Sequence, residues 1–293
     1  MKNLWSEGLL LISVTFWGAS FALTKPLLNN MGVFTFMASR FFFGGILLVA
    51  GLILTKRFTP DRQQWKGGIL TGALLFLAFI FHTYGLKYTS VAKNAFIVGS
   101  SVIFVPFVLT FIYKKPQIKS VWTSTVLALI GLALVTLDDV GGGINVGDFL
   151  TSIGTIVVAF YILNVEHFVK NGDPINIAAI QVLTVGLLSL IPAMILESPF
   201  IDLSPLNLTP LMIRNLLILI VACTSIAYAL ANYAQKYVPA TRTALLYVFE
   251  PIVGAFLGWI ILSEAVGIQG IIGAVLITFA TLYPQLLSKE QQT

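Results

Sequence analysis

Two charged residues, Glu250 and Arg40, stand out because each lies inside a long, mostly apolar stretch of the chain. Glu250 is near the middle of Thr241–Ser263, directly before Pro251, and Arg40 interrupts Met31–Thr55. A carboxylate in an apolar medium is costly, and such a group usually serves a function. The neighbouring proline removes a backbone hydrogen bond and allows a bend. Glu250 is therefore the first candidate for a group that binds a cation or exchanges a proton.

Arg40 has two interpretations that the sequence leaves open. Its guanidinium could bind a substrate carboxylate with two parallel hydrogen bonds. It could instead be the structural counter-ion of Glu250, since the two lie about 8 Å apart along the membrane normal if both segments are spanning helices. We favour the structural role for Arg40. Glu250 accordingly either faces a cavity or is locked in a pair.

Aromatic, hydroxyl and amide side chains in other apolar runs could complete a pocket. Trp17 lies in the middle of its run, where its indole N–H needs a partner, so we expect it to face a cavity. His82 is more often a satisfied core histidine than a ligand-binding one. The predicted substrate-binding residues are Trp17, Ser20, Phe21, His82, Asn94, Tyr161, Asn164, Tyr228, Asn232, Tyr247 and Glu250.

The sequence contains no recognisable pattern for catalysis, metal binding or nucleotide binding. HExxH, GxSxG and P-loop motifs are missing, so neither an enzyme nor an ATP-driven pump is expected. Two histidines and the single Cys223 argue against a zinc site and a disulfide, and we expect no cofactor or metal. The net charge of +5 does not indicate a nucleic-acid partner, because the cations lie in short loops between apolar blocks.

The composition identifies the elements that must position these residues. Hydrophobic residues make up 57% of the 293 residues and charged residues 10%, against roughly 25% charged in a soluble domain. Runs of about 20 apolar residues, the length of a spanning helix, recur along the chain. We predict an all-α integral membrane protein with ten transmembrane helices. The runs are Gly8–Thr24, Met31–Thr55, Gly67–Leu86, Asn94–Tyr113, Ser120–Leu137, Phe149–Val165, Pro174–Leu196, Asn215–Gln235, Thr241–Ser263 and Ala265–Ser288.

The distribution of lysine and arginine predicts how this bundle is oriented. With the N-terminus in the cytoplasm, twelve of these cations fall in cytoplasmic segments and four outside, with Arg40 inside the membrane. The positive-inside rule then places both termini in the cytoplasm. We expect a multi-pass protein of the cytoplasmic (inner) membrane, in contact with the lipid bilayer.

A weak internal repeat divides the chain into two halves. At an offset of 149 residues, 84–115 aligns with 233–264 and gives seven identities, among them Ala95 with Ala244. Five spans per half is an odd number, so the second half must be inverted, as in many secondary transporters. We predict a first five-helix repeat in 1–140 and a second, inverted one in 141–293. Lys93, expected on the outer side of the membrane, aligns with Arg242, expected on the cytoplasmic side. The inversion alone does not explain why both aligned positions carry a cation.

Several short motifs, in order, resemble EamA-type members of the drug/metabolite transporter superfamily. They are Trp17–Phe21 followed by Lys25, Arg40, Gly85–Ala92 with Pro106, and Leu246–Pro251 followed by Gly254, Gly258 and Glu264. The resemblance implies two inverted five-helix repeats, export of small metabolites, and a central cavity lined mainly by helices 1, 3, 4, 6, 8 and 9. One departure is Lys114-Lys115-Pro116, where members often carry a glutamate.

These observations predict a secondary transporter that exports amino acids or similar small metabolites by alternating access, as a monomer or homodimer. Proton coupling through Glu250 is a further expectation. An exporter of cationic or aromatic drugs is the alternative within the class, because an acidic residue among aromatic rings suits a cation. A membrane-embedded enzyme is the alternative of another class, and the few clustered nucleophiles and bases disfavour it.

Overall fold

The computed structural model describes residues 2–89, 91–136, 144–197, 209–262 and 267–290, and all regular structure in these ranges is helical. The helices are α1 (Lys2–Leu28), α2 (Val33–Leu54), α3 (Arg62–Tyr88), α4 (Val91–Gly99), α5 (Ser101–Phe107), α6 (Lys119–Thr136), α7 (Val146–Asn171), α8 (Pro174–Pro192), α9 (Pro210–Ile220), α10 (Ala227–Gln235), α11 (Ala240–Tyr247), α12 (Phe249–Leu262) and α13 (Ile268–Glu290). Three π-helical segments extend or join them: η1 (Val108–Ile112), η2 (Ala193–Glu197) and η3 (Val221–Ile226).

Six segments of the described chain are long and apolar enough to cross a membrane. They are Val33–Leu54, Arg62–Tyr88, Lys93–Ile112, Val146–Asn171, Pro174–Glu197 and Pro210–Gln235. The predicted all-helical class is therefore observed in the described residues, whereas the number of ten spans and the inverted repeat stay predictions.

Local sequence signals explain where several helices begin. The carboxylate of Asp61 accepts a hydrogen bond from Gln64 N at the start of α3. A reciprocal capping box between Asn145 and Asp148 starts α7, and Asp173 caps α8. These side chains satisfy backbone N–H groups that have no partner within the helix.

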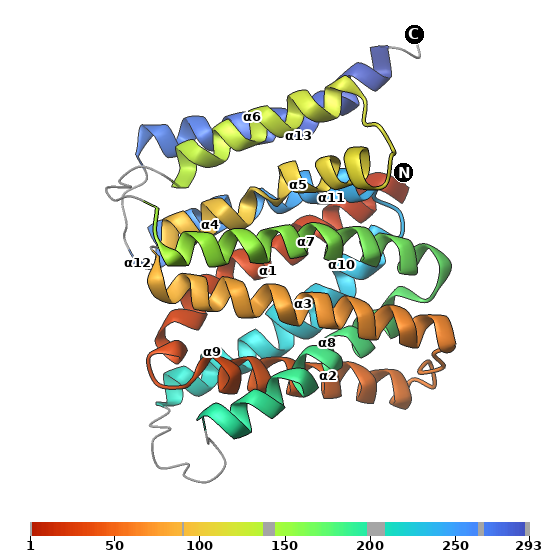
Figure 1. Ribbon diagram of the computed structural model, residues 1–293, viewed down its shortest axis with the longest axis vertical. Helices are drawn as coiled ribbons and strands as arrows, with labels where there is room; N and C mark the ends of the chain where they lie inside the picture. Colours follow the sequence, from red (N-terminus) through yellow and green to blue (C-terminus); the bar gives the residue numbers. More distant parts are fainter. Residues whose placement is uncertain (1, 90, 137–143, 198–208, 263–266, 291–293) are drawn as a thin grey trace.

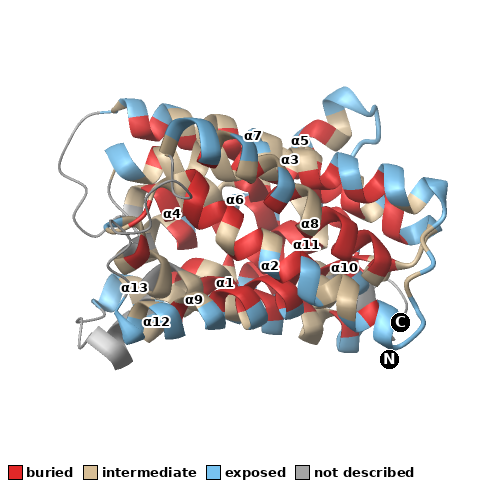
Figure 2. Ribbon diagram, turned by 90° about the horizontal axis from the view of Figure 1, so that it is seen from below, coloured by how far each residue is buried: buried red, intermediate tan, exposed pale blue. Residues whose placement is uncertain are grey.

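The helices lie side by side, with α6 and α13 paired at one edge of the bundle (Figure 1). The faces turned toward the middle of the bundle carry most of the buried residues (Figure 2). Glycines allow two of the closest contacts. A Cβ on Gly131 would lie 2.7 Å from the carbonyl oxygen of Gly273 across the α6–α13 contact. Gly68 and Gly72 lie against α8, and the lack of side chains at these two positions lets α3 and α8 pack closely.

The two opposite ends of the bundle are named here after an acidic residue at each, Asp148 and Glu7. At the Asp148 end, the starts of α4 and α7 meet the end of α3. At the Glu7 end, the starts of α1 and α11 meet the C-terminal part of α13. The Asp148 end is on the left in Figure 1, and the Glu7 end, with the labelled N-terminus, is on the right.

Two of the predicted continuous spans are broken. The helix that begins in Val91 is interrupted at Ser100, and the one that begins in Ala240 is interrupted at Val248. Pro251 explains the second break, because it has no N–H to bond the carbonyl of Tyr247 four residues earlier. The residues on the two sides of the break therefore do not follow one continuous helix. Thr243 is fully buried, whereas Tyr247 and Glu250 reach a cavity.

Candidate functional site

A cavity lies between the helices and contains about 1180 Å³ of empty space, including the space at its mouth. Its walls come from α1, α2, α3, α4, α5, α7, α10, α11 and α12. These include segments from all six spans that the family resemblance implies, together with α2. The lining residues are Trp17, Ser20, Thr24, Leu28, Phe36, Arg40, Leu75, Phe79, His82, Thr83, Leu86, Asn94, Ala95, Val98, Gly99, Ser101, Val158, Tyr161, Tyr228, Tyr247, Glu250 and Pro251.

The cavity is displaced toward the Asp148 end. In α1 it is lined from Trp17 to Leu28, which is the second half of that helix. In α3 it is lined from Leu75 to Leu86, again the half nearer the Asp148 end. No lining residue comes from the first fifteen residues of α1 or the first twelve of α3.

Three aromatic side chains form one side of the cavity. The ring centroid of Trp17 lies 5.1 Å from that of Tyr228 and 5.2 Å from that of Tyr247. The indole Nε1 of Trp17 is buried and has no hydrogen-bond partner in the described chain. These three residues were predicted from the sequence as substrate-binding, and the structure places all three at the cavity wall.

Buried amide side chains donate hydrogen bonds to the hydroxyls of two cavity-lining tyrosines. Gln235 Nε2 donates to the hydroxyl oxygen of Tyr247 over 3.1 Å, and Gln181 Nε2 donates to that of Tyr161 over 3.0 Å. Asn232 Nδ2 in turn donates to Gln181 Oε1 over 3.2 Å. Both glutamines are fully buried, and the sequence analysis did not select them. The signal that could have identified them is a polar glutamine within an otherwise apolar run.

Two predicted residues do not line the cavity. Asn232 is fully buried behind Tyr161 and reaches the cavity only through Gln181. Asn164 donates its Nδ2 to the carbonyl of Phe160 in its own helix, over 2.8 Å. Ser20 lines the cavity, with its hydroxyl donated to the carbonyl of Trp17. The side chains of Phe21 and Lys25 lie outside the described residues.

Arg40 and Glu250 both line the cavity but do not form the predicted ion pair. Arg40 Nε donates to Thr224 Oγ1 over 2.8 Å, and its NH2 group donates to the carbonyl of Cys223 over 3.2 Å. Both acceptors lie in η3, so Arg40 ties α2 to that segment. The Glu250 carboxylate makes no hydrogen bond or ion pair with any described residue. The two charges still interact electrostatically without a direct ion pair, so the role of Arg40 as the counter-ion of Glu250 stays a prediction; its direct hydrogen-bond partners are a hydroxyl and a carbonyl.

The opposite side of the cavity carries polar groups that bond to one another. Asn94 Nδ2 donates to Thr151 Oγ1 over 2.9 Å and to the carbonyl of His82 over 3.2 Å. His82 Nε2 lies 3.4 Å from Thr155 Oγ1, which also donates to the carbonyl of Ile97. His82 and Asn94 thus line the cavity while much of their bonding capacity is used within the protein.

Comparison with known proteins gives the chain a family context. The model of the EamA-like transporter family matches residues 4–137 and again residues 145–283. A solved structure described only as a crystal structure of a protein superposes with a TM-score of 0.81 and 16% sequence identity, covering 99% of this chain and all of the other. At that identity the likeness concerns the fold alone.

Three curated relatives span most of the chain. An uncharacterized transporter of Archaeoglobus fulgidus is 26% identical and covers 98% of this chain and 87% of its own length. An S-adenosylmethionine uptake transporter of Rickettsia bellii is 25% identical, over 94% of this chain and 91% of its own. An S-adenosylmethionine/S-adenosylhomocysteine transporter of Chlamydia muridarum is 24% identical, over 88% and 84% respectively.

Proposed function

The chain belongs to the EamA-like transporter family, and it is accordingly a multi-pass membrane transporter and not an enzyme. We propose that it is a secondary transporter that moves amino-acid-like metabolites through the cavity by alternating access. The observation that carries this proposal is that one cavity contains a carboxylate, Glu250, which makes no hydrogen bond with any described residue, and a guanidinium, Arg40, on a different helix.

The two charges suit the two ends of an amino-acid group. A guanidinium binds carboxylates, and Arg40 keeps further N–H groups beyond the two bonded to Thr224 and Cys223. A carboxylate binds an ammonium or another cationic centre, and Glu250 has its oxygens available in the cavity. A zwitterion would neutralise both charges at once, which lowers the cost of keeping them in an apolar medium.

The aromatic side of the cavity adds a preference for a cationic or planar group. Trp17, Tyr228 and Tyr247 form a cluster beside Glu250, and such rings attract cations over their faces. S-adenosylmethionine, named for two of the relatives, carries an amino-acid group, a sulfonium cation and a planar base. A compound of this kind matches all three features, so we propose this substrate class.

Direction and coupling are part of the proposal. We retain export from the cytoplasm for this chain, although one of the relatives is named for uptake. A carrier that alternates between two accessible states moves substrate either way, according to the gradients. We propose that Glu250 exchanges a proton during the cycle, because an unpaired carboxylate in an apolar medium is costly in its charged form.

An exporter of cationic drugs is the second candidate. The unpaired Glu250 beside aromatic rings favours it. Arg40 in the same cavity disfavours it, since a cation without a carboxylate would leave the guanidinium without a ligand.

We also propose ten spans arranged as two inverted five-helix repeats, 1–140 and 141–293, in the cytoplasmic membrane with both termini in the cytoplasm. The two successive matches of the family model and the two broken helices support this arrangement. In a Cys223→Ala background, a cysteine replacing Ile144, which is 94% exposed at the Asp148 end, should react with an impermeant reagent from outside. A cysteine replacing Lys170 should react only after permeabilisation.

Counterflow in proteoliposomes tests the substrate class. Vesicles preloaded with S-adenosylmethionine, methionine, a nucleoside or a quaternary amine are diluted into trace labelled substrate. We expect accumulation with the compounds that carry an amino-acid group and a cation, and little with the nucleoside. Accumulation with the quaternary amine alone would support the drug exporter instead. Asn164→Ala is the matched control, because among the described residues Asn164 bonds only within its own helix.

A further inference from the structure

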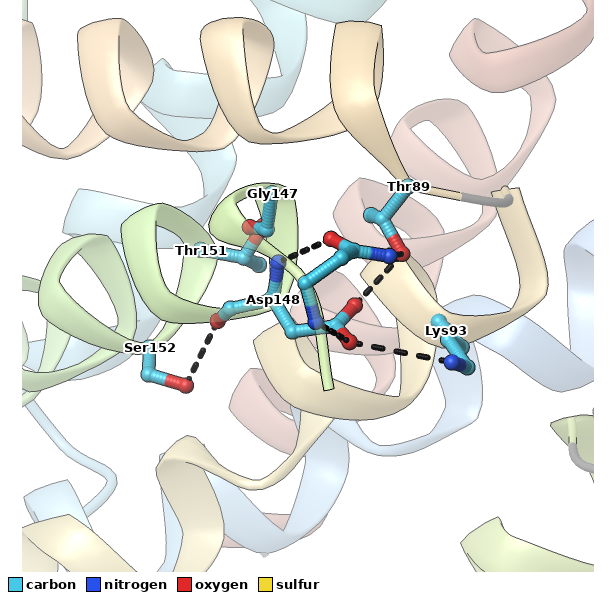
Figure 3. Close-up of polar contacts among 7 residues, drawn as sticks. Thr89, Lys93, Gly147, Asp148, Thr151 and Ser152 are labelled. Carbon is cyan, nitrogen blue, oxygen red and sulfur yellow. Dashed lines mark hydrogen bonds and ion pairs between the residues drawn. The ribbon is translucent and has the colours of Figure 1, made fainter. Parts of the chain in front are cut away.

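Two ion pairs lie at opposite ends of the bundle. At the Glu7 end, Arg242 binds Glu7 through two hydrogen bonds of 2.9 Å and also donates to the carbonyl of Thr281. At the Asp148 end, Lys93 Nζ lies 3.7 Å from Asp148 Oδ2. Figure 3 shows Asp148 between Lys93 and Thr89, whose hydroxyl donates to it over 2.5 Å. Each pair is largely shielded from solvent, with side chains 11–15% exposed.

The two pairs occupy equivalent places in the two halves of the chain. Lys93 is the third residue of α4 and Arg242 the third residue of α11, and both short helices end at a break. The two cations also align at the 149-residue offset of the internal repeat. Each binds an acid near the start of the first helix of the other half, Asp148 in α7 or Glu7 in α1. This explains why aligned cations occur at both ends of the bundle.

The surroundings of the two pairs differ in one respect. Next to Lys93, Asn94 and Ala95 line the cavity. Their counterparts next to Arg242, Thr243 and Ala244, are fully buried. Thr243 Oγ1 is moreover a buried hydroxyl without a hydrogen-bond partner in the described chain. The cavity therefore reaches the residues next to Lys93 and stops short of those next to Arg242.

We propose that Glu7–Arg242 and Lys93–Asp148 are a matched pair of gates, and that opening the Glu7–Arg242 gate makes Thr243 and Ala244 line the cavity. The proposal rests on the alternating access proposed above. In the present state the Glu7 end is closed by the two-contact pair and the backbone contact to Thr281. In the opposite state the two pairs exchange roles, and the Thr243 hydroxyl gains water or substrate as a partner.

Ala95 and Ala244 provide matched reporters, because they are the same residue at aligned positions. Each is replaced by cysteine in a Cys223→Ala protein, and its rate of reaction with a small, membrane-permeant thiol reagent is measured in proteoliposomes without substrate. Ala95→Cys should react faster than Ala244→Cys in the parent. Glu7→Gln should raise the Ala244→Cys rate by roughly tenfold and lower that of Ala95→Cys, as expected for a shift between two states.

Further variants separate a gate from a general loosening of the fold. Arg242→Gln should act in the same direction as Glu7→Gln, whereas Lys93→Gln should leave the Ala244→Cys rate at or below the parent value. Lys170→Gln is the control, because it removes an ion pair within α7, with Glu166. The proposal is overturned if Ala95→Cys and Ala244→Cys both react faster in Glu7→Gln, or if neither rate changes. Thermal melting of Glu7→Gln and Arg242→Gln identifies any variant that fails to fold. If one of them fails, the labelling rates of the variant that folds test the proposal.

The labelling rates need no substrate, so they separate this proposal from the proposed function. Opposite changes at the two reporters support the gates even if counterflow detects none of the tested compounds. Counterflow with unchanged labelling in both Glu7→Gln and Arg242→Gln supports transport and overturns the gates.

Discussion

The two sides of the cavity differ in what their polar atoms bind. The side formed by α3, α4 and α7 is called the partnered wall. There the Asn94 amide donates to the carbonyl of His82 and to the hydroxyl of Thr151, and the His82 ring contacts the hydroxyl of Thr155. On the side formed by α1 and α12, which we call the open wall, Glu250 makes no hydrogen bond in the described chain and Trp17 Nε1 has no partner. Both walls line the same space.

The difference separates structural polar groups from binding groups. A buried polar group that has partners stabilises the contact between helices, and removing it leaves those partners unsatisfied. A polar group that faces a cavity without a protein partner contributes little to folding but can bind a ligand. Substitutions on the partnered wall should therefore change stability, and substitutions on the open wall should change transport.

The largest effect on transport is expected from Glu250→Gln. The amide keeps the shape but cannot bind a cation as an ion, and losing a charge-assisted bond worth about 1.5–3 kcal/mol lowers transport by roughly tenfold or more. Initial rates of counterflow measure this. The same variant should abolish the response to an imposed pH gradient, while exchange of a neutral substrate continues in part.

The stability of Glu250→Gln tests the open wall itself. Because the carboxylate has no ion pair with a described residue, we expect its unfolding free energy to stay within about 1 kcal/mol of wild type. A large loss, restored by adding Arg40→Leu, would mean that the two charges act as a structural pair after all. Wild-type pH dependence in a stable Glu250→Gln protein would contradict proton coupling.

A smaller loss of transport is expected from Trp17→Phe. The change removes the larger indole ring beside Tyr228 and Tyr247, together with a buried N–H that has no hydrogen-bond partner among the described residues. Since a cation over an aromatic face is worth about 0.5–2 kcal/mol, we expect affinity for a cationic substrate to fall by several fold. Competition by unlabelled substrate measures this affinity. Trp65→Phe, which makes the same change on an exposed side chain away from the cavity, should have no effect.

On the partnered wall, Asn94→Ala should affect folding more than transport. It removes the bonds from Asn94 Nδ2 to Thr151 and to the carbonyl of His82, which should cost about 1–3 kcal/mol. Thermal melting in detergent measures the loss, and transport per folded molecule should stay near wild type. A stable Asn94→Ala protein that no longer binds substrate would assign Asn94 to the binding site instead.

The sequence predicted those parts of the molecule in which a residue type conflicts with its surroundings. A charge or a tryptophan in the middle of an apolar run is rare, and Arg40, Glu250 and Trp17 all reach the cavity. Aliphatic lining residues such as Leu75 and Val98 could not be selected, because they look the same as lipid-facing or packing residues.

Other features depend on contacts that sequence spacing cannot give. The partner of Arg40, Thr224, is 184 positions away and was not predictable from any local pattern. The proline at 251 indicated a bend, whereas the break at Ser100 had no comparable signal. Amides were ambiguous in the same way, since an asparagine in a spanning helix can face a ligand, another helix or its own backbone.

The smallest effect is expected from Asn164→Ala, which tests that last distinction. Asn164 lies half-buried in α7, three residues after the cavity-lining Tyr161, and in the described part of the chain its amide donates only to the carbonyl of Phe160. That carbonyl belongs to the same helix, so truncation removes no contact between helices, and alanine is the best helix former. We expect stability within about 0.5 kcal/mol of wild type and unchanged transport. Asn232→Ala should differ, because it removes the bond that holds Gln181 against Tyr161. Equal losses of transport in both variants would contradict the placement of Asn164 outside the cavity.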